Sequence, residues 1–162
     1  MTDTVTLIAF GASALLMAFV SGVFLAFSDF IMRSLAAATP GAGIEAMQLI
    51  NRKVLRSVFV VWLLALGPVA MGLGLYAWIA VEGPARAWFI AGTTLYVMGT
   101  FMVTILGNVP MNERLDRMAP DAAETRAYWR QYARGWTWWN HLRTVASGGA
   151  ALALLVGCAL SI

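Results

Sequence analysis

The segment from Trp136 to Thr144 combines side chains that commonly serve in proton transfer and in binding negatively charged oxygen. It reads Trp-Thr-Trp-Trp-Asn-His-Leu-Arg-Thr and contains the only histidine of the chain, His141. Histidine has an unperturbed pKa of roughly 6.5, so it accepts protons near neutral pH. Asn140 and Arg143 would stabilise a developing negative charge. The alternative interpretation is that His141 is structural and that the tryptophans form an interfacial belt.

Amide side chains form two further clusters. Asn108 and Asn112 flank Pro110 in the run Gly-Asn-Val-Pro-Met-Asn, and Gln48 and Asn51 lie three residues apart. Proline lacks a backbone N–H, so the helix should break or restart at Pro110, where the asparagines would either cap free carbonyls or face a pocket. Because polar groups within membranes normally face the bundle interior, we expect these amides to converge with the histidine segment.

Four windows without a charged residue must position these side chains. They are Thr4 to Ser28, Ser57 to Val81, Ala87 to Asn112 and Thr144 to Ile162. Each supplies the roughly 20 apolar residues that a helix needs to cross a bilayer. They must be helical, because an unpaired backbone amide costs several kcal/mol in lipid. We predict spans over about 5–27, 57–80, 87–108 and 142–161.

The fold prediction is therefore an all-α integral membrane four-helix bundle. With 162 residues, 60% of them hydrophobic and 12% charged, the chain fits a single domain over 1–162. An additional amphipathic interfacial helix is predicted over about 121–139. Its basic stripe consists of Arg126, Arg130 and Arg134, and its aromatic stripe consists of Tyr128, Tyr132 and Trp136.

Charge and ligand counts exclude several classes of function. A net charge of +3 is too weak to predict nucleic-acid binding in such a hydrophobic chain, so the expected partners are the lipid bilayer and a lipophilic small molecule. Cys158 is the only cysteine, which excludes an internal disulfide. One histidine and one cysteine are too few for the usual metal centres, so we predict no metal site.

Four segments carry a resemblance to a known family. They are Phe27 to Met32, Ala46 to Asn51, Gly107 to Asn112 and Trp136 to Thr144. In these segments and in the order of its spans, the chain resembles the anthrone-oxygenase-like family of small four-span membrane proteins. Arg33 stands where that family usually has proline, which affects the geometry expected of the first loop. Most bacterial members have no assigned function, and the resemblance places the chain in a bacterial inner membrane.

The resemblance implies chemistry as well as a fold. Fungal relatives are similar to enzymes that oxidise an anthrone to an anthraquinone with molecular oxygen, without a metal or organic cofactor. In such a reaction His141 would be the general base, and Arg143 would stabilise the charge of the oxyanion. Asn108, Asn112 or Asn140 would donate hydrogen bonds to that oxyanion. The candidate substrate-binding residues are Gln48, Asn51, Trp138, Asn140 and Thr144.

Two classes of function stay open at this point. The first is a membrane oxidoreductase of the anthrone-oxygenase type that acts on an anthrone-like or hydroquinone-like compound. The second is a non-enzymatic membrane protein that binds a small molecule or forms part of a larger complex. Homo-oligomerisation, quinone binding and haem binding are also left open. With one histidine per chain, a bis-histidine haem would require a dimer.

The distribution of basic residues predicts the orientation. Ten of the eleven Lys and Arg residues lie in the two connections between spans one and two and between spans three and four. The positive-inside rule places both connections in the cytoplasm and both termini outside it. Topology reporters fused at the carboxyl terminus and within 120–134 should therefore give opposite signals. A cytoplasmic carboxyl terminus would contradict this orientation.

Overall fold

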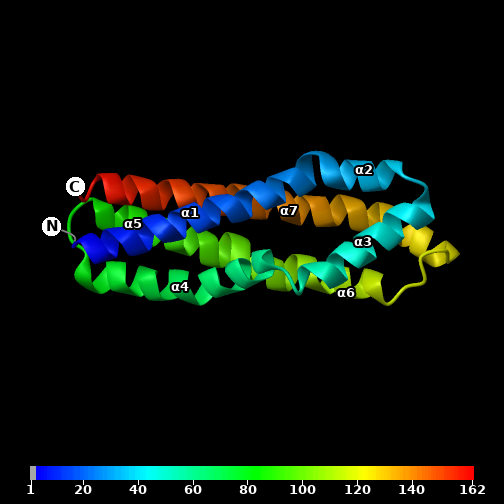
Figure 1. Ribbon diagram of the computed structural model, residues 1–162, viewed down its shortest axis with the longest axis horizontal. Helices are drawn as coiled ribbons and strands as arrows, with labels where there is room; N and C mark the ends of the chain where they lie inside the picture. Colours follow the sequence, from blue (N-terminus) through cyan, green and yellow to red (C-terminus); the bar gives the residue numbers. More distant parts are fainter. Residues whose placement is uncertain (1–2) are drawn as a thin grey trace.

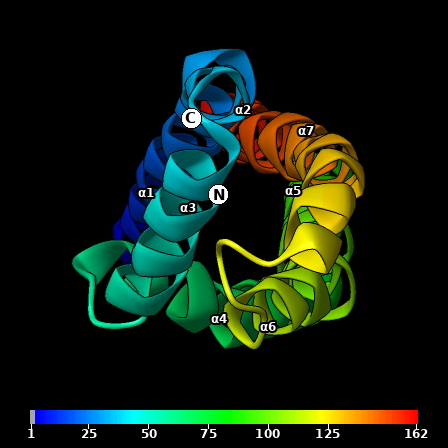
Figure 2. The ribbon, with the colours of Figure 1, turned by 90° about the vertical axis from the view of Figure 1, so that its right-hand side faces the viewer.

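A computed structural model describes residues 3–162, and this part of the chain contains helices and no strand. Four helices are long and apolar enough to cross a membrane (Figure 1): Thr4–Ala37, Val58–Ala80, Ala85–Asp116 and Ala123–Ala159. Viewed along the bundle, these helices surround a common axis (Figure 2). The predicted all-α membrane bundle is confirmed.

Each long helix is built from one or more elements. The first comprises α1 (Thr4–Ala26), the π-helical turn η1 (Phe27–Ile31) and α2 (Met32–Ala37), and α3 (Pro40–Val54) leads to α4 (Val58–Ala80). The next comprises α5 (Ala85–Tyr96), η2 (Val97–Met102), η3 (Thr104–Asn108) and α6 (Val109–Asp116), and the last is α7 (Ala123–Ala159).

The bundle extends well beyond the membrane at one end. At about 1.5 Å per residue, the 37 residues of α7 span about 55 Å, whereas the hydrocarbon core of a bilayer is about 30 Å thick. Both termini and the α4–α5 turn lie at one end, here called the terminal end, and α2, α3 and α6 lie at the other, the loop end (Figure 1). The polar connections are at the loop end, so this end projects into water.

The long bundle contains two separate hydrophobic cores. The membrane core contains a stacked pair, Phe10 and Phe89, whose ring centroids are 3.8 Å apart, together with small residues such as Ala14 and Ala150. The loop-end core is richer in aromatic and sulfur-containing side chains. It is formed by Met32, Ile44, Met47, Leu115, Tyr128, Trp129, Tyr132 and Trp136.

The helix predicted over about 121–139 is present, but it is the first half of α7 and not a separate helix lying on the membrane. Ala123–Ala159 is one uninterrupted helix. The aromatic stripe explains this arrangement, because Tyr128, Tyr132 and Trp136 are buried in the loop-end core. Burial of these large rings in the bundle removes more apolar surface from water than contact with the membrane surface on one side would.

Pro110 does not break the third long helix. The ring of a proline clashes with the carbonyl of the fourth preceding residue, and that residue, Leu106, lies in the π-helical turn η3. At the end of η3, the N–H of Val109 bonds to the carbonyl of Thr104, one residue further back than in an α-helix. The wider turn lets the helix continue into α6 and places Asn108 at the junction.

Glycines allow α5 and η2 to approach α7 closely. A Cβ added at Gly92 would lie 2.9 Å from the carbonyl oxygen of Ala150, and one added at Gly99 would lie 2.5 Å from the Cβ of Ala146. Membrane helices associate largely through such close packing, since lipid is as apolar as the side chains. This interface therefore fixes how α7 sits against the third long helix.

We predict that Gly92→Ala lowers the thermal unfolding midpoint in detergent. The new methyl group meets a backbone atom that cannot rotate away, and overpacking of this kind costs roughly 1–3 kcal/mol. Gly72→Ala is the matched control, because a Cβ there meets no atom within 4 Å. Equal midpoints for the two variants would show that the close approach is not needed.

Candidate functional site

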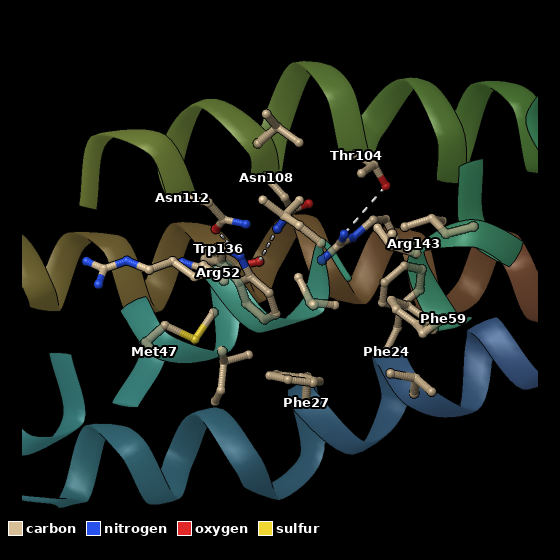
Figure 3. A pocket seen from close by; sticks show the side chains of 18 of the residues that line it. Phe24, Phe27, Met47, Arg52, Phe59, Thr104, Asn108, Asn112, Trp136 and Arg143 are labelled. Carbon is tan, nitrogen blue, oxygen red and sulfur yellow. Dashed lines mark hydrogen bonds between the residues drawn. The ribbon is translucent and has the colours of Figure 1, made fainter. Parts of the chain in front are cut away.

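A cavity of about 240 Å³ lies where the membrane core meets the loop-end core (Figure 3). Side chains of α1, η1, α3, α4, η3, α6 and α7 line it. Its aromatic lining consists of Phe24, Phe27, Phe59 and Trp136. Its polar lining consists of Asn51, Arg52, Thr104, Asn108, Asn112, Glu113, Asp116 and Arg143.

Arg143 is the most unusual residue of the cavity, because its guanidinium is buried without a carboxylate. The residue is 4% exposed, and no ion pair involves it within residues 3–162. Its Nη2 donates to Asn140 Oδ1 at 2.6 Å, and its Nη1 lies 3.5 Å from Thr104 Oγ1. The guanidinium carbon lies 4.1 Å from the ring centroid of Phe24, which supplies a cation–π contact.

One guanidinium nitrogen of Arg143 is left without a partner. Nε is buried and makes no hydrogen bond to any group in the described chain. α7 runs about 24 Å from Arg143 to its end at Ala159, at about 1.5 Å per residue, so the guanidinium lies near the boundary of the hydrocarbon on the side of the loop end. Ionisable groups at such depths are costly and commonly mark functional sites.

Asn140 holds Arg143 in place and also joins α7 to the first long helix. Its Nδ2 donates to the carbonyl of Phe24 and to Ser28 Oγ, both at 2.6 Å, while its Oδ1 accepts from Arg143. All three polar contacts are buried. The acceptors Phe24 and Ser28 lie at the junction of α1 with η1. Asn140 is therefore a positioning residue that does not itself line the cavity.

Asn108 offers an acceptor on the wall of the same cavity. Its Nδ2 lies 3.3 Å from the carbonyl of Trp136 and donates to it, but its Oδ1 is buried with no partner among residues 3–162 (Figure 3). Buried amide oxygens are rarely left unsatisfied, because each costs roughly 1–3 kcal/mol. The cavity thus has an unused donor on Arg143 and an unused acceptor on Asn108.

Asn112 orients the aromatic wall. Its Oδ1 accepts from Tyr132 Oη at 2.9 Å and from Trp136 Nε1 at 2.8 Å. Asn51, on α3, lies with its Nδ2 at 3.5 Å from Tyr132 Oη. These contacts fix the indole of Trp136, which also lies 5.3 Å from the Arg143 guanidinium carbon. Asn112 therefore holds the Trp136 indole beside the Arg143 guanidinium.

Charged side chains mark the part of the cavity that reaches the protein surface at the loop end. Arg52 Nε donates to Asp116 Oδ1 at 2.6 Å, which joins α3 to α6. Glu113 pairs with Arg117 at 3.4 Å. All four side chains are exposed to solvent, so this end of the cavity is in contact with water.

The predicted site residues fall into two groups. Asn51, Asn108, Asn112 and Arg143 line the cavity, as expected of a shared pocket. The other five do not line it. They are Gln48, Trp138, Asn140, His141 and Thr144.

His141 is the main departure from the expected site. Its side chain is exposed and lines a different, open groove together with Trp138, on the outer face of α7. Helix geometry explains this placement, because residues two apart on a helix point about 200° apart, and Arg143 faces inward. Its role as a general base is therefore not supported by contact with the cavity and stays a prediction.

Gln48 and Thr144 have structural contacts. Gln48 is buried, and its Nε2 donates to the carbonyls of Leu115 and Met118 at 2.7 and 2.8 Å, which satisfies the free end of α6. Thr144 Oγ1 donates to the carbonyl of Asn140 at 2.9 Å within α7. These donors therefore hold backbone carbonyls, and neither residue lines the cavity.

Sequence reasoning did not identify Thr104, Trp136 or the carboxylates of Glu113 and Asp116 as cavity residues. A signal existed for two of them, because Thr104 precedes Asn108 by four residues and Trp136 precedes Arg143 by seven, which are helical spacings. The phenylalanines of α1 and η1 carried no such signal in an apolar span. No group of three or more His, Cys, Asp or Glu side chains within residues 3–162 is placed to hold a metal ion.

Comparison with known proteins identifies the family. The profile described as anthrone oxygenase matches residues 52–153, which include Asn108, Asn112 and Arg143. Searches of curated proteins and of solved structures give no match. The matched range covers more than half of the chain and includes α4 to most of α7. The chain belongs to the anthrone oxygenase family of integral membrane proteins.

Proposed function

We propose that this protein binds a planar aromatic ketone in its ionised, enolate form within the cavity and oxidises it with molecular oxygen. The observation that carries the proposal is the buried guanidinium of Arg143, which has no carboxylate partner among residues 3–162. An uncompensated charge in a low-dielectric site costs several kcal/mol. An anionic ligand would offset that cost, so the site favours anions over neutral molecules of the same shape.

The two unused polar atoms narrow the ligand class. Arg143 Nε requires an acceptor, and Asn108 Oδ1 requires a donor. A ring system with an enolate or phenolate oxygen beside a hydroxyl group meets both requirements. Phe24, Phe27 and Trp136 supply flat apolar surfaces on which such rings pack. A hydroxylated anthrone fits this description.

The reaction is balanced without a further reductant. Loss of a proton from the methylene carbon gives a delocalised anion with negative charge on its oxygen. That anion passes electrons to oxygen and forms a carbon–oxygen bond, which gives a hydroperoxide after protonation. Loss of water from the hydroperoxide leaves a second carbonyl group. The sum is one anthrone plus one oxygen molecule giving one anthraquinone plus one water molecule.

Arg143 acts on the first of these steps. An opposite charge within contact distance lowers an acid's pKa by about 1–3 units, so the guanidinium makes the methylene easier to ionise. A strong base is then unnecessary, and the proton passes to water or to the carboxylate of Glu113 at the exposed end of the cavity. His141 is assigned no role in this scheme.

The proposal predicts that the cavity binds the ionised form of an aromatic dye more tightly than the neutral form. A hydroxylated anthraquinone such as 1,8-dihydroxyanthraquinone changes its visible spectrum on ionisation and does not react further. We expect the pKa of its phenol to fall by about 1–3 units on binding to the wild-type protein in detergent. Arg143→Gln should bind the neutral dye and abolish the shift. His141→Gln is the control and should retain the shift.

The proposal also predicts that the protein turns over an anthrone, which is measured as oxygen uptake. Arg143→Gln should lower kcat/KM by about 10²- to 10³-fold, the typical loss when a group that stabilises an oxyanion is removed. His141→Gln should stay close to the wild-type rate. If His141→Gln is as inactive as Arg143→Gln, the histidine is the base and the present assignment is wrong.

A wild-type protein that shifts the dye pKa but takes up no oxygen would support the alternative function, a membrane protein that binds aromatic anions without oxidising them. The network around Asn140 and Asn112 is consistent with either function, because it holds the binding site whether or not chemistry follows.

A further inference from the structure

A second concave site lies on the outside of the bundle, between the first long helix and α7. It is an open groove lined by Arg33, Arg134, Thr137, Trp138, His141 and the apolar side chain of Met32, among others. A neighbouring hollow on α7 shares Arg134 and Trp138 with it and adds Arg130. Neither hollow contains a residue of the cavity, so the groove is a separate site.

The groove is positively charged. Arg134 is exposed and makes no ion pair with any residue in the range 3–162. Arg33 also lines the groove, and its one acidic partner, Asp29, lies 3.7 Å away with 65% of its side chain exposed. Such an exposed pair contributes little and is readily exchanged for another anion. Arg134 and the imidazole of His141 therefore face no carboxylate of the described chain at close range.

The groove lies at the depth of lipid headgroups. Counting about 20 residues back from the end of α7, the length needed to cross the hydrocarbon, reaches the region of residue 140. Trp138 is 63% exposed at this level, and exposed tryptophans are typical of the membrane boundary. Arg134 lies one turn further out, about 6 Å beyond Trp138 along the helix axis.

We propose that this groove binds an anionic phospholipid, with Arg134 and Arg33 around the phosphate and with Trp138 and His141, which lie further toward the membrane, beside the glycerol and the start of the acyl chain. Trp138 follows Arg134 by four residues along the chain and His141 follows Trp138 by three, so these side chains share one face of α7. The exposed ring of Trp138 lies on the membrane side of Arg134, where the glycerol and acyl chain of a lipid would contact it, whereas a free phosphate ion would not.

The test is native mass spectrometry of the full-length protein in detergent, titrated with phosphatidylglycerol or phosphatidylcholine of the same acyl chains. The wild type should bind phosphatidylglycerol more tightly than phosphatidylcholine. Arg134→Gln should weaken phosphatidylglycerol binding about fivefold, the effect expected for one basic residue at a membrane surface. Arg126→Gln is the matched control, because Arg126 is also an exposed arginine of α7 but lies outside the groove.

Two results would overturn the proposal. One is equal affinity of the wild type for the two lipids. The other is an equal loss of phosphatidylglycerol binding in Arg134→Gln and Arg126→Gln, since general charge attraction alone would then account for the binding. Both positions are exposed on a regular helix, so neither variant should disturb folding.

Discussion

The site depends on the guanidinium of Arg143, which is buried where a cation has a high desolvation cost. Arg143 is tolerated because Asn140 Oδ1 accepts from it and because aromatic faces of Phe24 and Trp136 lie beside it. None of these neighbours carries a negative charge, so they orient the cation without neutralising it. The result is a preorganised positive site, and electrostatic stabilisation is strongest where the groups do not have to reorganise as charge develops. A carboxylate at the same position would satisfy the arginine and remove its capacity to bind an anion.

Two of the helices that surround the cavity depart locally from α-helical geometry. π-helical turns occur at Phe27–Ile31 and Thr104–Asn108, next to Phe24 and Asn108 on opposite walls of the cavity. A π turn inserts one extra residue and widens the helix, which rotates the side chains that follow it, and such turns are frequent at functional sites. The asparagines have distinct tasks within this frame. The Oδ1 of Asn112 accepts from two aromatic side chains and that of Asn140 accepts from Arg143, whereas the Oδ1 of Asn108 has no partner in the described chain.

Hydrophobicity predicts four membrane-spanning helices, because lipid imposes one simple requirement on every residue of a span. The side of a helix on which a polar residue falls is harder to predict. The polar side chains between Trp136 and Thr144 predict a single pocket that contains His141 and Arg143. These two residues are two apart, however, and on a helix that spacing directs them to nearly opposite sides of α7. The sequence pattern also does not predict that the helix over about 121–139 and the fourth span form the single helix α7. The pattern of Tyr128, Tyr132 and Trp136 predicts the aromatic stripe of an interfacial helix, and only the positions of α3 and α6 show that these rings are core residues. Nothing in the sequence of α1 distinguishes Phe24 from the lipid-facing phenylalanines nearby.

The uninterrupted course of α7 ties the cavity to the thickness of the membrane. A bundle adapts to a thicker or thinner bilayer mainly by changing the tilt of its helices. α7 contains no break between the loop-end core and Ala159, so it tilts as one rod, and it carries both Trp136 and Arg143. The opposite walls belong to α1, α4 and η3. Hydrophobic mismatch would therefore alter the separation of the arginine from Phe59 and Asn108, which makes lipid composition a determinant of the size of the cavity as well as of the position of the protein in the membrane.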